Sequence, residues 1–365
     1  MECIEMKEII RWYEELHVIP EVGWKEFKTT DKIAAILDEI GVSYQRFPDM
    51  TGIVAEMGQG DEVIAVRADI DALWQEVDGV WQGNHSCGHD ANIAMVLGAI
   101  FSLKDTGLAK KIRFIFQPAE EKGEGALALI EKGVMDQVTH LFGIHLRPIE
   151  ELPLGKVSAS IRHGAHVALI GKVEGVDAHA ARPHQGQNAL DVIASLHQLL
   201  KTIYIDPSEA CSVKLTKVIA GGESINIIPG VAEFAIDVRA QKNEVLSKIC
   251  TKVEQIIGKL EALFEMTINW EWTGYTPAAE VSKEAEEIVE EAIKFLFGEK
   301  AFVPFVITPG GDDFHFYTIK RPDVKASMIG VGANLKPGLH HPKMFFDKSA
   351  LHQGAKILAE TLRRV

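Results

Sequence analysis

Hydrophobic and polar residues in the first part of the chain, up to about residue 145, follow two alternating patterns. In some segments apolar residues recur every three or four positions, which predicts amphipathic helices; elsewhere they form short runs or alternate with polar residues, which predicts strands. Strands that alternate with helices are typical of an α/β layer fold with a largely parallel sheet. We expect helices over 5–17, 30–40, 93–103 and 123–132, and strands over 52–57, 63–67, 111–117 and 141–145.

The middle of the chain has a different pattern. Between about residues 160 and 276, four strand-like runs and two helical patterns predict an α+β unit, and after residue 277 the earlier alternation returns. The sequence therefore predicts a discontinuous catalytic domain, 1–163 and 277–365, interrupted by an inserted lid, 164–276. The inserted strands are expected over 167–173, 212–219, 232–240 and 266–273, the inserted helices over 188–204 and 244–260, and the later elements are a helix over 282–297, a strand over 326–331 and a helix over 349–364.

Composition and charge narrow the class of protein. A chain of 365 residues with 47% hydrophobic and 25% charged residues is typical of a globular protein of about two domains. The net charge of −14 gives no basic field for nucleic acid, and the longest apolar run, 93–101, is far shorter than the ~18 residues that cross a membrane. The first ten residues contain no apolar signal segment, and the four scattered cysteines do not suggest a disulfide framework. We therefore expect a cytoplasmic protein with no nucleic-acid or membrane partner.

Residues of the types that bind metal ions gather directly after strand-like runs. In open α/β sheets ligands bind beside the carboxyl ends of the strands, so loops from several strands can converge on one site. Taken alone, each group is more simply explained as a solvated acidic turn or a hydrogen-bonded histidine. Only the shared position of the groups after strand-like runs favours a metal-binding role. The groups are Asp69 and Asp71 in RADIDAL, Cys87 and His89 in HSCGHD, Glu120 and Glu121 in QPAEE, His145 in GIHLRP, and His340 or His341 in GLHHP.

The residue types in this set suit a transition metal. Cys87 lies before a predicted helix, whose N-terminal dipole favours the thiolate, the form that binds metal. A cysteine, two or three histidines and one or two carboxylates suit zinc, manganese, cobalt or nickel, and do not suit calcium. Of two adjacent carboxylates, one can bind metal while the other acts as a general base, and the spacing does not decide between Glu120 and Glu121.

Taken together, the ordered motifs resemble those of the M20 metallopeptidases, and within them the branch of aminoacylases, hippurate hydrolases and auxin-conjugate amidohydrolases. The resemblance covers nearly the whole chain. Trp74 stands where this branch usually has proline, Asn92 where it has histidine, and Asp312 where it has glutamate; Trp74 and Asn92 bear on the pocket wall and so on substrate preference. The motifs are RADIDAL (67–73), SCGHD (86–90), FQPAEE (116–121), HLRP (145–148), DAHAARPHQGQNALD (177–191), GGESINIIPG (221–230), GGDDFHFY (310–317) and LHHPKMFFD (339–347).

The resemblance implies a catalytic domain that binds two divalent ions (Mn²⁺, Zn²⁺, Co²⁺ or Ni²⁺) and a smaller lid domain that forms a homodimer. His340 is preferred to His341 as a ligand because the ligand of the family stands two residues before a proline, here Pro342. The implied metal ligands are Cys87, His89, Glu121, His145 and His340.

The same resemblance implies a role for four other residues. Glu120 is the implied general base, and His179, Asn226 and Arg239 of the lid are the implied groups that hold the substrate carboxylate or the oxyanion. The implied activity is a metal-dependent amidohydrolase that cleaves the amide bond of N-acyl amino acids or related conjugates with an activated water.

Three alternatives stay open at this point. A dipeptidase of the same fold would prefer free dipeptides to N-acyl amino acids. An amidase that uses Cys87 as a nucleophile would resist chelators and form a covalent adduct. A non-catalytic binding module would hold metal or peptide without turnover.

Overall fold

The computed structural model describes residues 2–108 and 110–365, which form two compact units. The large unit takes in the chain up to Arg162, then Glu280–Ile307 and Asp312–Val365; the inserted unit consists of His163–Ala279 and Thr308–Gly311. The predicted boundaries, after residues 163 and 276, lie one and three residues from these divisions. The chain enters and leaves the inserted unit at neighbouring points, because the Ala279 amide donates to the His163 carbonyl oxygen at 3.0 Å.

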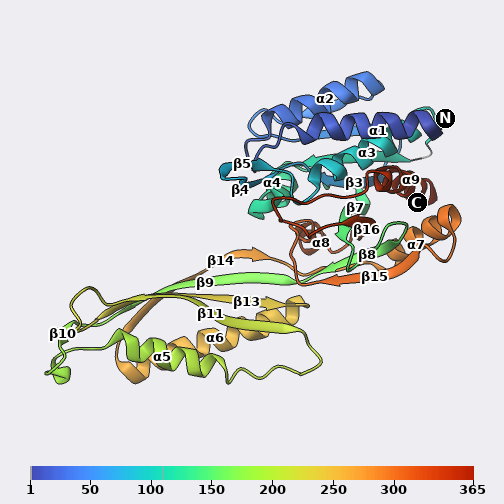
Figure 1. The fold of residues 1–365 in the computed structure, drawn as a ribbon. Helices are drawn as coiled ribbons and strands as arrows, with labels where there is room; N and C mark the ends of the chain where they lie inside the picture. Colours follow the sequence, from blue (N-terminus) through green and yellow to red (C-terminus); the bar gives the residue numbers. More distant parts are fainter. Residues whose placement is uncertain (1, 109) are drawn as a thin grey trace. The chain divides into compact units, whose positions relative to one another are not determined.

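The large unit is built on an eight-stranded mixed sheet with the order β1-β2-β6-β3-β7-β16-β8-β15 (Figure 1). The central strands β6, β3, β7 and β16 are parallel to one another, while β1, β2 and β8 run antiparallel to their neighbours. The expected largely parallel central sheet is thus confirmed. The strands are β1 (Tyr44–Arg46), β2 (Ile53–Met57), β3 (Val63–Asp69), β6 (Lys111–Gln117), β7 (Val138–Pro148), β8 (Val157–His163), β15 (Phe302–Thr308) and β16 (Lys325–Leu335).

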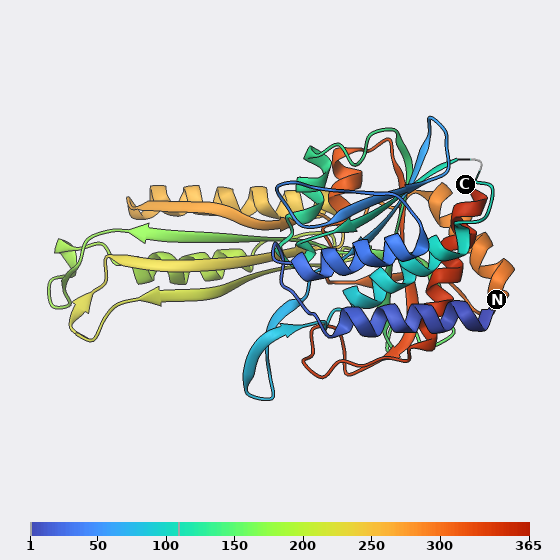
Figure 2. The same cartoon turned by 90° about the horizontal axis from the view of Figure 1, so that it is seen from above.

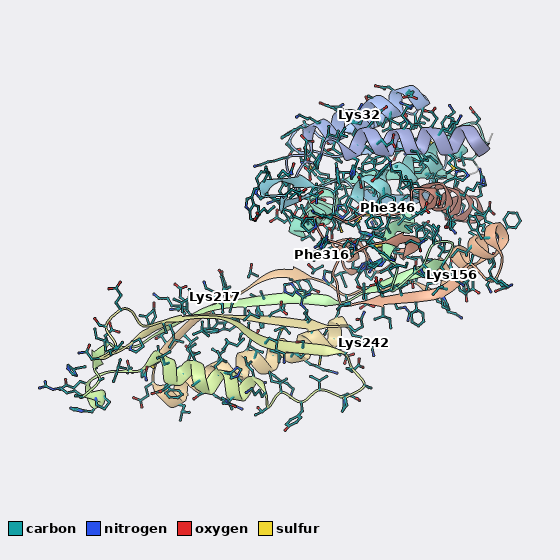
Figure 3. The ribbon with its side chains drawn as sticks, in the orientation of Figure 1. Lys32, Lys156, Lys217, Lys242, Phe316 and Phe346 are labelled. Atoms are coloured by element: carbon teal, nitrogen blue, oxygen red, sulfur yellow. The ribbon has the colours of Figure 1, made fainter. Side chains whose placement is uncertain are left out.

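Helices cover both faces of this sheet. Successive side chains of a strand point to opposite faces of its sheet. In β3, Ile64 and Val66 belong to one hydrophobic core, and Val63 and Ala65 belong to another. The first core is shared with five helices, of which α1, α3 and α9 pack side by side (Figure 2). The second core is shared with two short helices and includes Phe316 (Figure 3). The helices of the first core are α1 (Glu2–His17), α2 (Phe27–Ile40), α3 (His89–Leu103), α7 (Lys283–Phe297) and α9 (Ser349–Arg364), and those of the second are α4 (Gly125–Glu131) and α8 (His315–Lys320).

The inserted unit is a four-stranded antiparallel sheet with the order β11-β13-β9-β14. Two helices share its hydrophobic core, which gives the α+β character that the sequence predicts. A separate pair of two-residue strands, β10 and β12, joins two loops of this unit. The elements are β9 (Ala165–Glu174), β10 (Ala178–His179), α5 (Ala189–Leu200), β11 (Cys211–Ala220), β12 (Ile227–Ile228), β13 (Val231–Ala240), α6 (Asn243–Phe264) and β14 (Thr267–Thr276).

Three details correct the expectations from sequence. Helix α3 begins at His89, four residues before Ile93, because its polar first turn is buried and hydrogen-bonded. Strand β7 continues to Pro148, so His145 lies within a strand instead of after one. The helix expected over 123–132 is shorter, Gly125–Glu131 (α4), and a separate 3₁₀ turn, Glu120–Lys122, precedes it.

The pattern also misses a hairpin, formed by β4 (Leu73–Val77) and β5 (Val80–Asn84). Its strands are exposed or half-buried along their length, so they lack the apolar alternation of a core strand. None of the described helices combines the length and the apolar character needed to cross a bilayer.

Candidate metal centre

Six of the side chains singled out from sequence lie together in the large unit. They form three sets in which the possible ligand atoms lie within 4.8 Å of one another, and the sets overlap because Cys87, His89 and Glu121 each belong to two of them. Overlapping sets of this kind suit a pair of neighbouring ions. The sets are Cys87, His89 and His145; Cys87, Glu121 and His340; and His89, Glu120 and Glu121.

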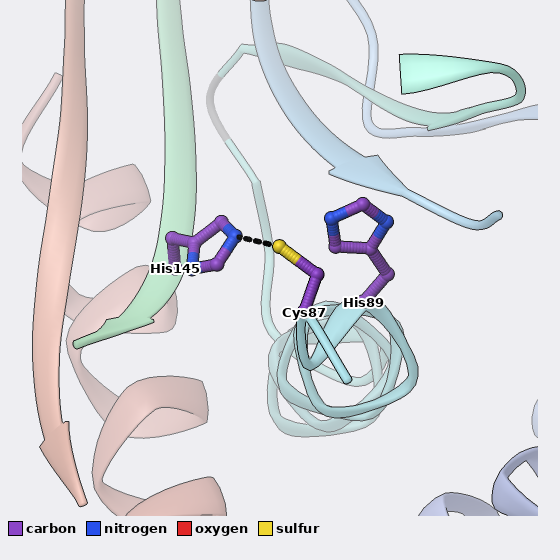
Figure 4. A group of neighbouring side chains, drawn as sticks. All are labelled: Cys87, His89 and His145. Carbon is purple, nitrogen blue, oxygen red and sulfur yellow. Dashed lines mark hydrogen bonds between the residues drawn. The ribbon is translucent and has the colours of Figure 1, made fainter. Parts of the chain in front are cut away.

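The distances between these side chains are short. The Cys87 Sγ lies 3.6 Å from the His145 Nε2 (Figure 4). The His340 Nε2 lies 3.4 Å from the Glu121 Oε1. The His89 Nε2 faces both glutamates, at 3.7 Å from the Glu120 Oε2 and 3.9 Å from the Glu121 Oε1.

The turn at Gly88 places the first two ligand candidates. Gly88 has a φ of 85°, in the left-handed region that glycine adopts at little cost, and it directly precedes α3. Cys87 therefore lies just before the helix and His89 is its first residue (Figure 4). The His89 ring is oriented from behind, because its Nδ1 lies 2.9 Å from the Asp71 carbonyl oxygen. A second partner of this kind fixes the orientation of a metal-binding histidine.

Buried carboxylates hold the turn that presents the glutamate pair. Ala119 has a φ of 53°, unusual for a residue with a side chain. Its amide donates to the Glu26 Oε1 at 2.8 Å, and the next two amides, of Glu120 and Glu121, donate to the two carboxylate oxygens of Asp71 at 3.2 and 3.1 Å. Three successive N–H groups are thus fixed by two carboxylates that are themselves buried. Asp71 acts here on the backbone and joins none of the three sets.

The pKa values of several side chains in the cluster differ strongly from their ordinary values. Burial alone would raise the pKa of Cys87, but the neighbouring His89 and His145 outweigh it and lower that pKa to about 6. Contacts with Cys87 and Glu121 raise the pKa of His340 to about 10. Burial opposes the charged form of His89, yet Asp69 and Cys87 outweigh it and raise its pKa well above the ordinary value. In the metal-free protein the cluster therefore pairs the Cys87 thiolate with the protonated His340 near neutral pH.

Two buried atoms show that the donors fit a metal ion. The His89 Nε2 and the Glu121 Oε1 are both inaccessible to solvent and lack a hydrogen-bond partner within the described part of the chain. Buried polar atoms almost always form hydrogen bonds, so a nitrogen and an oxygen that form none with the described residues, and lie 3.9 Å apart, call for a ligand. Thiolate, imidazole and carboxylate donors are together the set that divalent transition metals prefer.

A buried network that the sequence reasoning missed lies behind Glu120. Arg67 is buried and forms ion pairs of 2.6 Å with Asp69, 2.7 Å with Asp313 and 3.2 Å with Asp312. Burial first, and then the carboxylates of Asp312 and Glu121, raise the pKa of Glu120 well above its ordinary value. The sequence did contain a signal for this network. Arg67 lies within a run that predicts a buried strand, and a buried arginine needs carboxylate partners.

The two glutamates differ in their surroundings. Burial works to raise the pKa of Glu121 too, but its contact with His340 and the charge of His89 outweigh burial and lower that pKa. Glu121 is thus held as a carboxylate, whereas Glu120 has a higher affinity for a proton.

The three remaining candidates lie in the inserted unit. His179 is exposed on β10, opposite Ile227, and its Nδ1 accepts from the Ala181 amide at 3.1 Å. The Asn226 carbonyl oxygen accepts from the Ala180 amide at 2.9 Å, so Asn226 and the His179 loop are neighbours. Arg239 lies near the far end of β13, where its Nε donates to the Asp237 Oδ1 at 3.0 Å. Within this unit, His179 and Asn226 are brought together and Arg239 is not.

Comparison with known proteins gives this cluster a context. Residues 65–364 match the model of peptidase family M20/M25/M40. The chain is 31% identical to N-acetyl-L-cysteine deacetylase of Bacillus subtilis, covering 98% of this chain and 88% of that protein, and 30% identical to IAA-amino acid hydrolase ILR1-like 4 of Arabidopsis thaliana, covering 96% and 83%. Its fold is similar to that of the Bacillus subtilis YXEP protein, a dinuclear metal-binding peptidase of family M20, with a TM-score of 0.83, 27% identity, and coverage of 99% of this chain and 98% of that one. The M20 resemblance expected from the sequence motifs is confirmed, and the chain belongs to the peptidase family M20/M25/M40.

Proposed function

We propose that this protein is a metal-dependent amidohydrolase that cleaves the amide bond of N-acyl amino acids or related conjugates. The observation that carries the proposal is a pair of buried atoms that form no hydrogen bond with any described residue, the His89 Nε2 and the Glu121 Oε1, inside overlapping sets of side chains that could hold a metal. Relatives named as an N-acetylcysteine deacetylase and an IAA-amino acid hydrolase support the substrate class.

The proposed ligands are Cys87, His89, Glu121, His145 and His340, which would hold two divalent ions. When bound, the ions lower the pKa of a water and polarise the substrate carbonyl. Because thiolate and imidazole suit Zn²⁺, Co²⁺ and Ni²⁺, and carboxylate also suits Mn²⁺, the donor set favours these four ions.

Glu120 is the proposed general base. Its carboxylate belongs to the set of His89 and Glu121, and its pKa is raised above the ordinary value, as suits a group that takes a proton from water and returns it to the leaving nitrogen. Glu121, whose pKa is lowered, is the better ligand because it stays a carboxylate. These opposite environments, which spacing could not reveal, support the assignment that the family motif implies.

Residues of the inserted unit are the proposed contacts of the substrate. His179 would donate to the oxyanion, and Asn226 and Arg239 would bind the carbonyl or the carboxylate. The span from Val231 to Arg239 along β13 is eight residues, or about 26 Å at ~3.3 Å per residue, and His179 lies beyond the Val231 end. One inserted unit therefore cannot bring both His179 and Arg239 to one small substrate. This separation supports a homodimer in which two copies contribute to each site.

A reducing compartment such as the cytoplasm is proposed because Cys87 binds metal only as a thiolate. The described cysteines Cys87, Cys211 and Cys250 are free of disulfides. Oxidation of Cys87 would remove one donor from two ligand sets at once.

The decisive experiment is metal analysis followed by an activity screen. We expect the purified protein to hold two divalent ions per chain, to lose activity with a chelator, and to regain activity with Mn²⁺, Zn²⁺, Co²⁺ or Ni²⁺. The screen compares N-acyl amino acids with free dipeptides of the same side chains.

Each alternative has its own result in this screen. Faster turnover of dipeptides would favour a dipeptidase. Activity that survives chelation, together with an acyl adduct on Cys87, would favour a cysteine nucleophile, which the low pKa of that thiol makes the strongest rival. Bound metal without turnover of either substrate class would leave a binding module.

A further inference from the structure

The hairpin β4–β5 lies against two segments that carry proposed metal ligands, and one glutamine joins all three. The Gln75 Nε2 donates to the His340 carbonyl oxygen at 2.8 Å. On its other side, the Gln75 Oε1 accepts from the Ser86 hydroxyl at 2.8 Å and from the Asn84 amide at 3.1 Å. Ser86 directly precedes Cys87. The side chain of Gln75 therefore bridges the segment of Cys87 and the segment of His340.

The two ligand segments are also bonded to each other. The His340 amide donates to the Ser86 carbonyl oxygen at 2.7 Å, so the N–H and the C=O of His340 are both fixed by this arrangement. A second side chain of the hairpin contacts the same segment. The Asn84 Nδ2 donates to the carbonyl oxygen of Pro342, two residues after His340, at 3.0 Å. An ion pair between Asp78 and Lys343 adds little because both side chains are about 70% exposed.

His340 needs such support more than the other ligand candidates. It lies in a turn outside the helices and strands, with a φ of 63°, a conformation that is unfavourable for a residue with a side chain. Its side chain is 54% exposed, whereas that of His89 is buried. Packing therefore does not fix the His340 ring, and its position depends on the backbone contacts of the loop.

We propose that Gln75 is a positioning residue for the metal site: it holds the His340 backbone against the Ser86–Cys87 segment so that the imidazole reaches the ion beside Glu121. The inference rests on the proposed function, since it takes His340 to be a ligand. Gln75 touches no metal itself and acts through His340. Partners of this kind change metal affinity by about 10–100-fold when removed.

The test is a zinc titration of the metal-free protein against a chelating indicator, with Gln75→Met and a matched control. Methionine keeps the length of the side chain and removes its hydrogen bonds. Gln82 is the control because it is paired with Gln75 across the same hairpin, and its side chain has no hydrogen bond within the residues that the structure describes. We expect one of two zinc ions to bind about 10–100-fold more weakly in Gln75→Met, and both to bind as in the native protein in Gln82→Met.

A double mutant tests whether Gln75 affects zinc binding through His340. In a His340→Ala background the ligand is already lost, so Gln75→Met should weaken zinc binding by less than about twofold further. Three results would each overturn the inference. They are a further loss of about 10–100-fold from Gln75→Met in the His340→Ala background, native zinc affinity in Gln75→Met, and equal losses in Gln75→Met and Gln82→Met. Failure of the proposed metal site gives a different result, because the native protein would then bind no pair of zinc ions at all. Melting curves of the metal-free variants should coincide, which separates lost positioning from a damaged fold.

Discussion

Except for the half-exposed His340, the ligand candidates of the large unit are held in the opposite way to His179 of the inserted unit. In the large unit, Cys87, His89 and His145 are buried, and the turn before Glu120 is fixed by three hydrogen bonds to buried carboxylates. In the inserted unit, His179 is exposed on a two-residue strand. The contrast follows from the chemistry proposed for each. Metal ligands must hold their geometry before anything binds, whereas a group that contacts the substrate must be accessible to it.

The proposed general base gives the largest expected effect and tests the large unit directly. Glu120→Gln keeps the shape of the side chain and removes its basic carboxylate. We expect retained metal and a fall in kcat of at least about 10²-fold, within the ~10²–10⁴ range of acid–base catalysis. Metal content and steady-state kinetics measure both.

Glu121→Gln is the matched comparison. It should lower metal occupancy, because its oxygen belongs to two ligand sets. Loss of metal from Glu120→Gln together with full metal in Glu121→Gln would show that the two assignments are reversed.

The exposed histidine of the inserted unit comes next. His179→Ala should fold normally, keep both metals and lose about 10²–10³-fold in kcat with a smaller change in KM, as when one oxyanion donor is deleted. The reason is that its contact is made mainly with the charged tetrahedral state. An unchanged kcat would show that the His179 loop has no catalytic role. The comparison of the two units would then concern structure alone.

Mixing two inactive variants shows which copy supplies His179. If His179 acts across a dimer, hybrids of His179→Ala and Glu120→Gln contain one complete site and regain activity. If it acts within its own chain, mixing restores nothing. Size measurement of the mixture confirms that hybrids have formed.

The buried carboxylate Glu26 tests how far preorganisation in the large unit matters. Glu26→Ala releases the Ala119 amide and should weaken metal binding by about 10–100-fold, because the turn before Glu121 loses an anchor. Glu26→Gln retains an acceptor for that amide and should lose much less. Glu21→Ala is the control, since Glu21 lies in the same segment but accepts from Thr29 instead. Equal losses in Glu26→Ala and Glu21→Ala, measured by metal titration, would reduce the effect to general stability.

The smallest expected effect concerns pH. The pKa of His340 is raised to about 10 in the metal-free protein, so at pH 7 a metal ion must displace its proton. Metal affinity should therefore rise with pH, by about tenfold per pH unit for each proton displaced, until His340 has lost its proton near pH 10. Titrations at pH 6.5, 7.5 and 8.5 in non-coordinating buffer measure the slope. A flat profile would mean that the cluster binds metal without releasing protons.

Sequence patterns located the ligand candidates well because strand ends and motif residues are local features. His89, Glu121 and His340 lie 32 or more residues apart in the chain, yet each could be named from its own short motif. The supporting contacts could not be named in this way. Glu26 reaches Ala119 across 93 residues and Gln75 reaches His340 across 265, and neither contact has a periodic signal in the chain. The start of α3 was misplaced for a related reason, since its polar first turn is satisfied by partners distant in sequence.

The adjoining points at which the chain enters and leaves the inserted unit bear on how such proteins diversify. A segment whose two ends are joined by one hydrogen bond, from Ala279 to His163, can lengthen, shrink or be exchanged without rerouting the chain around it. The proposed metal ligands all lie outside that segment, whereas the proposed substrate contacts His179, Asn226 and Arg239 lie inside it. With these assignments, the metal chemistry and part of the substrate contacts belong to separate modules, so new specificities can be explored by exchange of one module while the other stays intact.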